Sequence, residues 1–347
     1  MGMPSLIRAE CVLRDQRRAR RWLSLLLLGA SACAHGQICQ SAEDMDASVR
    51  TALEATAKRY FEMSAHGDTL ALEQNSIASV VANFAGIEAA VKENQGGFIG
   101  AQATVRPPFL LVVEGQAPLA RAEFLCGVFG KSGQTKDSAV FVLNNLPPGK
   151  YGVTILDVNG GTAAVTLTLT LVLEQRYGEW KLAGFFPRPS RGAGHDAAWF
   201  AQRARDFTAK ALKRNAWLYY REAIFLAVPV DMMSTLATDQ LYDAAQAVEP
   251  SDVPANGKAV DLSAGGKIYR LTEISPLSVG NDLDVVVKYQ AADVSDTARV
   301  FQENTVVIKA LVAKFPELRE AFAGVVARAV APSGRDYGTL LGMKDIK

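Results

Sequence analysis

The sequence predicts an α+β fold, because helical and strand patterns occupy different stretches of the chain. Apolar residues recur at helical spacing through residues 44–92, and the spacing then changes to every second residue through residues 109–186. A helical hairpin is predicted at residues 195–249, and a small region of mixed type closes the chain at residues 258–347. Separate runs of helices and strands, without regular alternation, are typical of α+β proteins.

The first 36 residues predict an export signal. Arginines crowd residues 17–21, an apolar run fills residues 22–28, and small residues follow. The run has signal-peptide length and is too short to span a bilayer. Cleavage after Ala34 or Gly36 would release a periplasmic or extracellular protein, whereas a lipobox ending at Cys33 would make it a lipoprotein. The arginine pairs match the twin-arginine pattern poorly and favour an ordinary basic flank.

The charge of the mature chain argues against a polyanionic partner. The whole chain has 37 Lys and Arg against 36 Asp and Glu, and residues 1–36 contain six arginines and two acids, which leaves 31 against 34. No cluster of basic residues interleaved with aromatics occurs in the mature sequence. We therefore expect no nucleic-acid partner, and membrane contact only through a lipid anchor at Cys33.

Two cysteines remain in the mature chain once the leader is removed. Cys39 follows the expected cleavage site closely, and Cys126 lies in the apolar run at residues 122–126. In an oxidising compartment these thiols form a natural disulfide pair. The alternative is a free, buried Cys126 that packs as a small hydrophobic side chain.

The elements of the first region follow from periodicity and turn signals. One helix is expected at residues 44–66, stopped by Gly67-Asp68, and a second at residues 69–92, stopped by Gly96-Gly97. Turn signals at residues 147–150 and 159–161 then separate strand patterns. The expected strands are residues 109–113, 121–129, 138–143, 151–157, 163–175 and 180–186.

Residues 40–190 resemble the NTF2-like, or cystatin-like, α+β fold. The resemblance is carried by Tyr60-Phe61 and Gly67-Asp68 at the end of the first helix and by the closing strand at residues 177–182. It implies helices packed in the concave side of a curved antiparallel sheet. Residues 145–151 are instead typical of a transthyretin-like sandwich, which remains an alternative for residues 100–186; the two leading helices favour the first resemblance.

The NTF2-like resemblance implies an apolar pocket, in which some family members use a buried Asp or His as general base. The weak catalytic candidates here are His66 and Asp157. His66 stands at a helix end, where an imidazole caps the last carbonyls, and Asp157 precedes a turn that it can anchor. These structural roles are favoured for both residues, and no acid–base pair is predicted.

The helical hairpin at residues 195–249 resembles one tetratricopeptide unit. Small residues Ala204, Ala216 and Ala223 allow close helix approach, and Phe207 and Tyr220 fill the space between the helices. A single hairpin needs neighbours to bury its outer faces, so we expect it to bridge the flanking regions. The other aromatic residues are expected in the core, and His195 is expected to form part of an N-cap with Asp196 instead of binding a metal. Those aromatic residues are Trp199, Phe200, Trp217, Tyr219 and Phe225.

The closing region, residues 258–347, is expected to be a small α+β domain. Strand patterns occur at residues 267–273 and 283–290, and a capped amphipathic helix is predicted at residues 297–314. After Pro316 a further helix is predicted at residues 317–330. In the tail at residues 334–338, the charged pair Arg335-Asp336 is expected to form a local salt bridge in a turn, and a functional site is the alternative.

The mature chain as a whole is similar to an uncharacterised family of exported bacterial proteins, through residues 145–151, 184–189 and 337–341. That resemblance implies no activity. The sequence contains no metal-binding box, phosphate loop or nucleophile motif, so no cofactor is expected. We expect a non-enzymatic envelope protein that binds a small apolar ligand or a protein partner; the alternative is a hydrolase or isomerase with its site in the N-terminal domain cavity.

Overall fold

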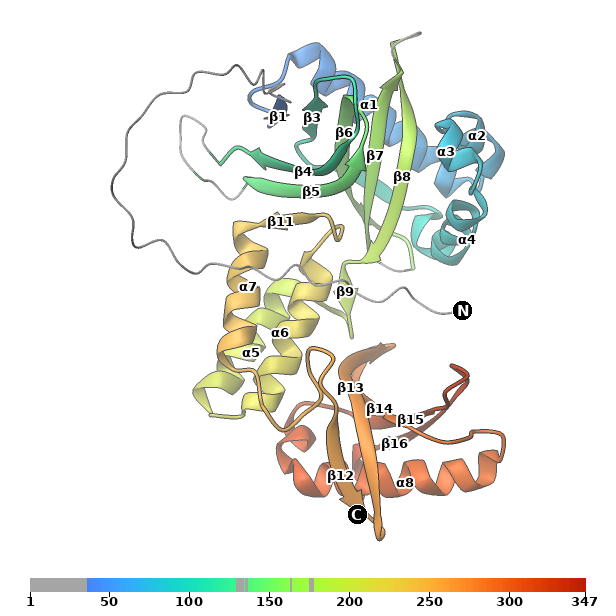
Figure 1. Ribbon diagram of the computed structural model, residues 1–347, viewed down its shortest axis with the longest axis vertical. Helices are drawn as coiled ribbons and strands as arrows, with labels where there is room; N and C mark the ends of the chain where they lie inside the picture. The colour runs from blue at the N-terminus through green and yellow to red at the C-terminus, as the bar shows by residue number, and fades with distance from the viewer. Residues whose placement is uncertain (1–35, 129–133, 135–136, 163, 175–177) are drawn as a thin grey trace, which may run out of the picture. The chain divides into compact units, whose positions relative to one another are not determined.

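The computed structural model describes residues 36–128, 134, 137–162, 164–174 and 178–347 (Figure 1). The predicted leader, apart from its last residue, and the lipidation candidate Cys33 lie outside these residues. The fold is α+β, as the sequence predicts, with helices set against mainly antiparallel sheets. Among the described helices, none combines the length and the apolar character needed to cross a membrane.

The first sheet, sheet A, is wholly antiparallel. Its strands follow the order β1-β3-β6-β7-β8, and β2 also pairs with β6. Side chains of β6 alternate between two cores: Val153 and Ile155 face one, and Leu156 and Val158 face the other. The strands are β1 (Gln37–Gln40), β2 (Gln102–Val105), β3 (Phe109–Val113), β6 (Gly149–Asn159), β7 (Val165–Glu174) and β8 (Glu179–Pro189).

Four helices cover one face of sheet A (Figure 1). The core between them is filled by large, fully buried side chains, including Leu53, Tyr60 and Phe98. The Tyr60 hydroxyl lies 2.9 Å from the carbonyl oxygen of Asn75 and 3.0 Å from that of Trp180, and it can donate to either. The helices are α1 (Ala47–Ala65), α2 (Thr69–Gln74), α3 (Ala78–Val81) and α4 (Ala85–Phe98).

The single helix predicted at residues 69–92 is wrong, because the chain is interrupted after α2. The side chains of Asn75 and Ser76 donate back to the carbonyl oxygens of the last turn of α2, which ends the helix. The main chain then bonds to β8: Ile77 N–H donates to Leu182 O, and Leu182 N–H donates to Asn75 O. These long-range bonds replace the helical ones, and periodicity alone does not reveal them.

A second sheet, sheet B, covers the opposite face of sheet A. It contains β4 (Leu119–Cys126), β5 (Ala139–Leu146) and β11 (Met233–Thr235), in the order β11-β5-β4. Phe124 and Phe141 pack against Phe109, whose ring centroid lies 5.1 Å from that of Phe141. Sheet A is therefore the middle of three layers.

A disulfide joins the two sheets at one end. Cys39 on β1 and Cys126 on β4 are bonded, and their Cα atoms lie 5.1 Å apart, which is a normal separation for a disulfide. The predicted pairing is thus present, and Cys126 is fully buried. The bridge fastens the N-terminal strand, which stands at the edge of sheet A, to sheet B.

Four helices and a five-stranded sheet form most of the rest of the described chain and share one hydrophobic core. The sheet order is β12-β13-β14-β15-β16, and β14 runs parallel to β15, to which α8 connects it. The helices are α5 (Ala197–Ala209), α6 (Lys213–Ala227), α7 (Leu236–Ala247) and α8 (Thr297–Lys314), with 3-10 turns η1 (Pro316–Glu320) and η2 (Met343–Asp345). The strands are β12 (Val260–Ala264), β13 (Lys267–Val279), β14 (Asp282–Gln290), β15 (Gly324–Val330) and β16 (Asp336–Gly342), beside a short hairpin of β9 (Arg191–Gly192) and β10 (His195–Asp196).

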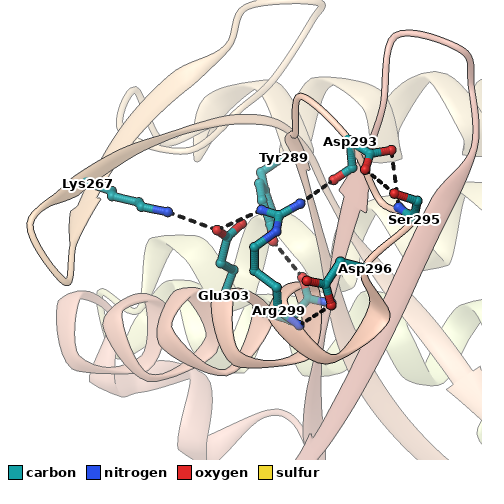
Figure 2. A network of polar contacts seen from close by, with 8 residues as sticks. Lys267, Tyr289, Asp293, Ser295, Asp296, Arg299 and Glu303 are labelled. Atoms are coloured by element: carbon teal, nitrogen blue, oxygen red, sulfur yellow. Dashed lines mark hydrogen bonds and ion pairs between the residues drawn. The ribbon is translucent and has the colours of Figure 1, made fainter.

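Polar contacts hold α8 against this sheet (Figure 2). Asp296 caps the helix by accepting from Arg299 N–H at 3.0 Å. Glu303 accepts from Lys267 at 2.9 Å and from Arg299 at 3.0 Å. Burial opposes ionisation of Glu303, but these two cations outweigh it and hold its pKa below the ordinary value. Deeper in the interface the Tyr289 hydroxyl donates to Asn304 at 2.8 Å.

The helix predicted at residues 317–330 is wrong. After η1 the chain forms β15, in which Val325, Ala327 and Ala329 are fully buried and the residues between them are partly exposed. This alternation is the period of a strand. The predicted salt bridge in the tail is also wrong, because Asp336 starts β16 and accepts from Arg328 on the neighbouring strand at 3.3 Å.

Removing the disulfide should destabilise the protein strongly. The bridge closes a loop between residues 87 positions apart, which corresponds to about 4 to 5 kcal/mol in the chain-entropy model. We expect the double substitution Cys39→Ser with Cys126→Ser to lower the free energy of unfolding, measured by urea denaturation, by about that amount. A reductant should lower the free energy of unfolding of the wild type by the same amount and leave that of the double variant unchanged. A change in the stability of the double variant on reduction would contradict the assignment of the effect to the Cys39–Cys126 bridge.

Tyr60→Phe should test the polar contact in the N-terminal core. The substitution removes the hydroxyl from two main-chain carbonyl oxygens and leaves the ring in place. We expect the free energy of unfolding to fall by about 1 to 2 kcal/mol. Tyr242→Phe is the matched control, because the Tyr242 side chain is exposed and removal of its hydroxyl should change the free energy of unfolding little. Equal effects of the two substitutions would show that the Tyr60 hydroxyl contributes nothing.

Candidate functional site

A pocket of about 210 Å³ opens where α5 and α6 meet the start of β14. Its walls come from three parts of the chain that lie far apart in sequence. The β9–β10 hairpin and the two helices form one side, the β13–β14 turn forms another, and the segment between η1 and β15 closes the base. The lining residues are Ala193, His195, Trp199, Phe200, Tyr219, Asn281, Asp282, Leu283, Ala321 and Ala323.

Local sequence explains how the first wall forms. Ala193 and Gly194 both have positive φ, 48° and 79°, and they turn the chain between β9 and β10. Asp196 then accepts from Trp199 N–H at 2.9 Å and caps α5, so the first turn of that helix projects Trp199 and Phe200 toward the pocket. The buried Ala204 and Ala216 let α5 and α6 approach closely.

Aromatic rings dominate this wall. His195 stacks on Trp199 with ring centroids 3.7 Å apart and planes 6° from parallel. Phe200 lies 5.0 Å from Trp199 and 5.5 Å from Tyr219, so the rings form a continuous surface. Phe200 and Tyr219 are buried, whereas Trp199 is 38% exposed at the rim. The surface can contact a ligand without rearrangement.

A buried hydrogen bond fixes the base of the pocket. The Tyr219 hydroxyl donates to the carbonyl oxygen of Ala321 at 2.7 Å and so joins α6 to the segment that leads into β15. Burial raises the pKa of Tyr219 to about 12, against a smaller opposing effect of Arg203. The hydroxyl therefore stays protonated, and its role is to position two lining residues.

The opposite wall is acidic. Asn281 and Asp282 lie at the turn between β13 and β14, where Gly280 has a φ of 60°. Asp284, two residues further on, is only 4% exposed. Burial, reinforced by the charge of Asp282, raises the pKa of Asp284. Within the described residues, neither carboxylate forms an ion pair.

A second buried acid supports the hairpin from behind. Glu222 on α6 is buried and receives only a long hydrogen bond from Ser278 Oγ, at 3.5 Å. The β9 backbone covers it so closely that a Cβ on Gly192 would lie 2.5 Å from Glu222 Oε1. Burial raises the pKa of Glu222, and the Ser278 hydrogen bond offsets this only in part.

The two weak catalytic candidates lie outside this pocket and apart from each other. His66 is exposed at the end of α1, where its Nδ1 lies 2.7 Å from the carbonyl oxygen of Glu62. Asp157 on β6 accepts two hydrogen bonds from Arg106, at 2.9 and 2.6 Å. The large buried side chains between the helices and sheet A fill the region in which the sequence places a cavity.

Sequence reasoning missed the roles of His195 and Trp199. Asp196 caps α5 through its side chain, whereas His195 is paired in β10 and stacks on Trp199. Of the aromatic residues expected in the core, Phe200, Trp217, Tyr219 and Tyr220 are buried, but Trp199 and Phe225 are not. A His four residues before a Trp at a capped helix start is the one signal of this stack in the sequence.

The pocket offers aromatic surface, the imidazole of His195, one amide and one carboxylate, with the Tyr219 hydroxyl already bonded. No group of three or more His, Cys, Asp or Glu side chains able to hold a metal ion occurs in the part of the chain that the structure describes.

Glu222→Gln should stabilise the protein in a pH-dependent way. The pKa of Glu222 is raised in the folded state, so the unfolded state releases its proton at a lower pH than the folded state does. Above the unfolded pKa, the buried Glu222 carboxyl therefore lowers the free energy of unfolding. Below the unfolded pKa, this loss is absent. We expect a gain of about 1 kcal/mol at pH 7 that vanishes near pH 4, measured by urea denaturation. Glu62→Gln, at an exposed site in α1, should show no such difference. A gain that persists at pH 4 would contradict this account.

Comparison of the chain with protein-family models, with curated proteins and with solved structures found no match.

Proposed function

We propose that the mature protein is an exported, non-enzymatic binding protein whose pocket between α5, α6 and the β13–β14 turn holds one small organic group. The group belongs to a small ligand or to a side chain of a protein partner. The observation that carries this proposal is the pocket itself, with its preformed aromatic wall and its fixed base.

The size of the pocket defines what can enter it. Pockets for drug-sized molecules enclose about 300 to 1,000 Å³, and this one encloses about 210 Å³. A group the size of one amino-acid side chain matches that volume. Partner proteins commonly anchor themselves by inserting such a group into a well-packed pocket.

Export is supported by two independent features. The leader at residues 1–36 has the basic flank, apolar run and small residues of a signal peptide. The Cys39–Cys126 disulfide suits an oxidising compartment, since such bridges are rare in the cytosol of mesophiles. A periplasmic or extracellular location is consistent with both.

The two catalytic candidates of the sequence are engaged in structural contacts outside the pocket: His66 caps a helix and Asp157 is held by Arg106. In the pocket, the Tyr219 hydroxyl is bonded to a main-chain carbonyl. General-base catalysis needs a group within hydrogen-bond reach of a substrate proton. The titratable side chains that line the pocket beside Tyr219 are His195 and Asp282, and a catalytic role would rest on them.

The domain resemblances remain part of the proposal. The packing of α1 to α4 on one face of antiparallel sheet A supports the NTF2-like resemblance. The antiparallel packing of α5 on α6 through small residues supports the tetratricopeptide-like one. Neither resemblance supplies a ligand.

Filling the pocket should abolish binding. Ala323 lines the pocket from an exposed position, so Ala323→Trp should occupy it without disturbing the core. We expect native mass spectra of the mature wild type, purified from its export compartment, to show an added mass that is lost on denaturation. The matched control Ala209→Trp, at an exposed site in α5 that does not line the pocket, should keep this mass, and Ala323→Trp should lose it. A bare wild-type mass, or the same added mass on Ala323→Trp, would contradict the proposal.

A further inference from the structure

We infer that the group taken by this pocket is an organic cation, an ammonium carried on a short apolar or aromatic stem. This inference rests on the proposed binding function of the pocket and names the chemical class of its ligand. It follows from the charge of the lining residues, from the carboxylate of Asp282, which forms no ion pair within the described residues, and from the aromatic side chains that line the same pocket.

The lining residues carry negative charge and no fixed positive charge. Asp282 lines the pocket, Asn281 beside it adds an amide oxygen that can accept, and none of the ten lining residues is Lys or Arg. An anionic ligand would meet the Asp282 carboxylate without a compensating cation. A cationic ligand would gain a charge-assisted hydrogen bond there.

Asp282 is free to make that bond. Across the described ranges of the chain, the ion pairs engage other carboxylates and leave Asp282 and Asp284 without a cation. Asp284, two residues along β14, is buried; burial raises its pKa and the charge of Asp282 adds to this effect. A ligand cation at Asp282 would relieve this repulsion between the two carboxylates.

The aromatic wall suits a cation as well as an apolar stem. Aromatic rings attract ammonium groups through the negative charge of their faces, by about 0.5 to 2 kcal/mol. Trp199, Phe200 and Tyr219 line the pocket together, and Trp199 is open to solvent at its rim. An ammonium at Asp282 with its stem on these rings would satisfy both walls at once.

The guanidinium whose charge acts on Tyr219 is already engaged. The charge of Arg203 acts on Tyr219, but its guanidinium lies over the ring of Phe207, 5.0 Å from the centroid. The same group lies 4.0 Å from the carboxylate of Asp206. Neither Phe207 nor Asp206 lines the pocket, so Arg203 does not occupy the position that the ligand cation would take.

A charge series of isosteric probes tests this inference. Benzylammonium, benzyl alcohol and benzoate have similar shapes and carry positive, zero and negative charge. We would titrate each into the full mature protein and measure dissociation constants by saturation-transfer NMR. We expect benzylammonium to bind at least tenfold more tightly than benzyl alcohol and benzoate not to bind.

Variants of one carboxylate make the test specific. Asp282→Asn should weaken benzylammonium about tenfold and leave benzyl alcohol unchanged, whereas Asp282→Glu should retain most of the affinity. Asp261→Asn is the matched control, since Asp261 is exposed on β12 and does not line the pocket. Asp282 is at an exposed turn, and unchanged denaturation midpoints of the variants would confirm that they fold.

The outcomes separate this inference from the proposed function. Equal binding of alcohol and ammonium, with both lost in Ala323→Trp, would overturn the cationic class and leave the pocket as a binding site. Failure of all three probes to bind would also overturn the cationic class, and the mass-spectrometric test of the pocket would stand independently. If Asp261→Asn weakens the binding of benzylammonium as much as Asp282→Asn does, the role of Asp282 is overturned.

The ammonium can come from a free amine or from a lysine side chain of a partner. A capped lysine peptide and its norleucine analogue distinguish these sources. If the lysine peptide binds more tightly than benzylammonium and its norleucine analogue does not bind, the ammonium belongs to a partner protein. Tighter binding of the free amine would assign it to a small ligand.

Discussion

Three side chains of α6 hold the helical region against the C-terminal sheet by donating to main-chain carbonyl oxygens. Asn215 donates to Glu317 at 2.6 Å, Tyr219 to Ala321 at 2.7 Å, and Arg221 to Ile274 at 2.6 Å. Buried polar groups cost free energy unless they are hydrogen-bonded, so sliding α6 along the sheet would break several bonds together. The pocket depends on this constraint, because α6 forms part of one side and the bonded segment at Ala321 forms the base.

The same junction is reinforced by charge. Arg214, one helical turn before Leu218, forms ion pairs with Asp252 and Glu317 and lies over the ring of Phe315, 4.3 Å from its centroid. The hydrogen bonds and charges of both acids outweigh the effect of burial, which is the largest single contribution, and raise the pKa of Arg214. Such a network is partly shielded from solvent and specifies one arrangement of the helices, which is what a preformed binding site requires.

Local pattern predicts the α+β class, the strands β3 to β8, β13 and β14, and the long helix at residues 297–314, which the structure reproduces with the same bounds. The other half of the strands in the described residues is not predicted. Local pattern failed where tertiary contacts decide. Leu182 N–H donates to Asn75 O and Leu182 O accepts from Ile77 N–H across the fold. The apolar run in β15 fits a helix or a strand until β14 and β16 flank it. The pocket was beyond sequence reasoning because its walls come from residues near 195, 219, 282 and 321, which no spacing connects.

The short strand β11 has a consequence for how the chain can be divided. The strand β11 pairs antiparallel with residues 139–141 of β5. Beside this pairing, Val142 N–H donates to Met232 O at 2.9 Å. A fragment ending near residue 190 would contain all of sheet A yet leave one side of β5 without its ladder. An open strand edge is a template for pairing with another chain. The edge of β5 in the N-terminal region therefore stays unpaired until residues 233–235 have joined it.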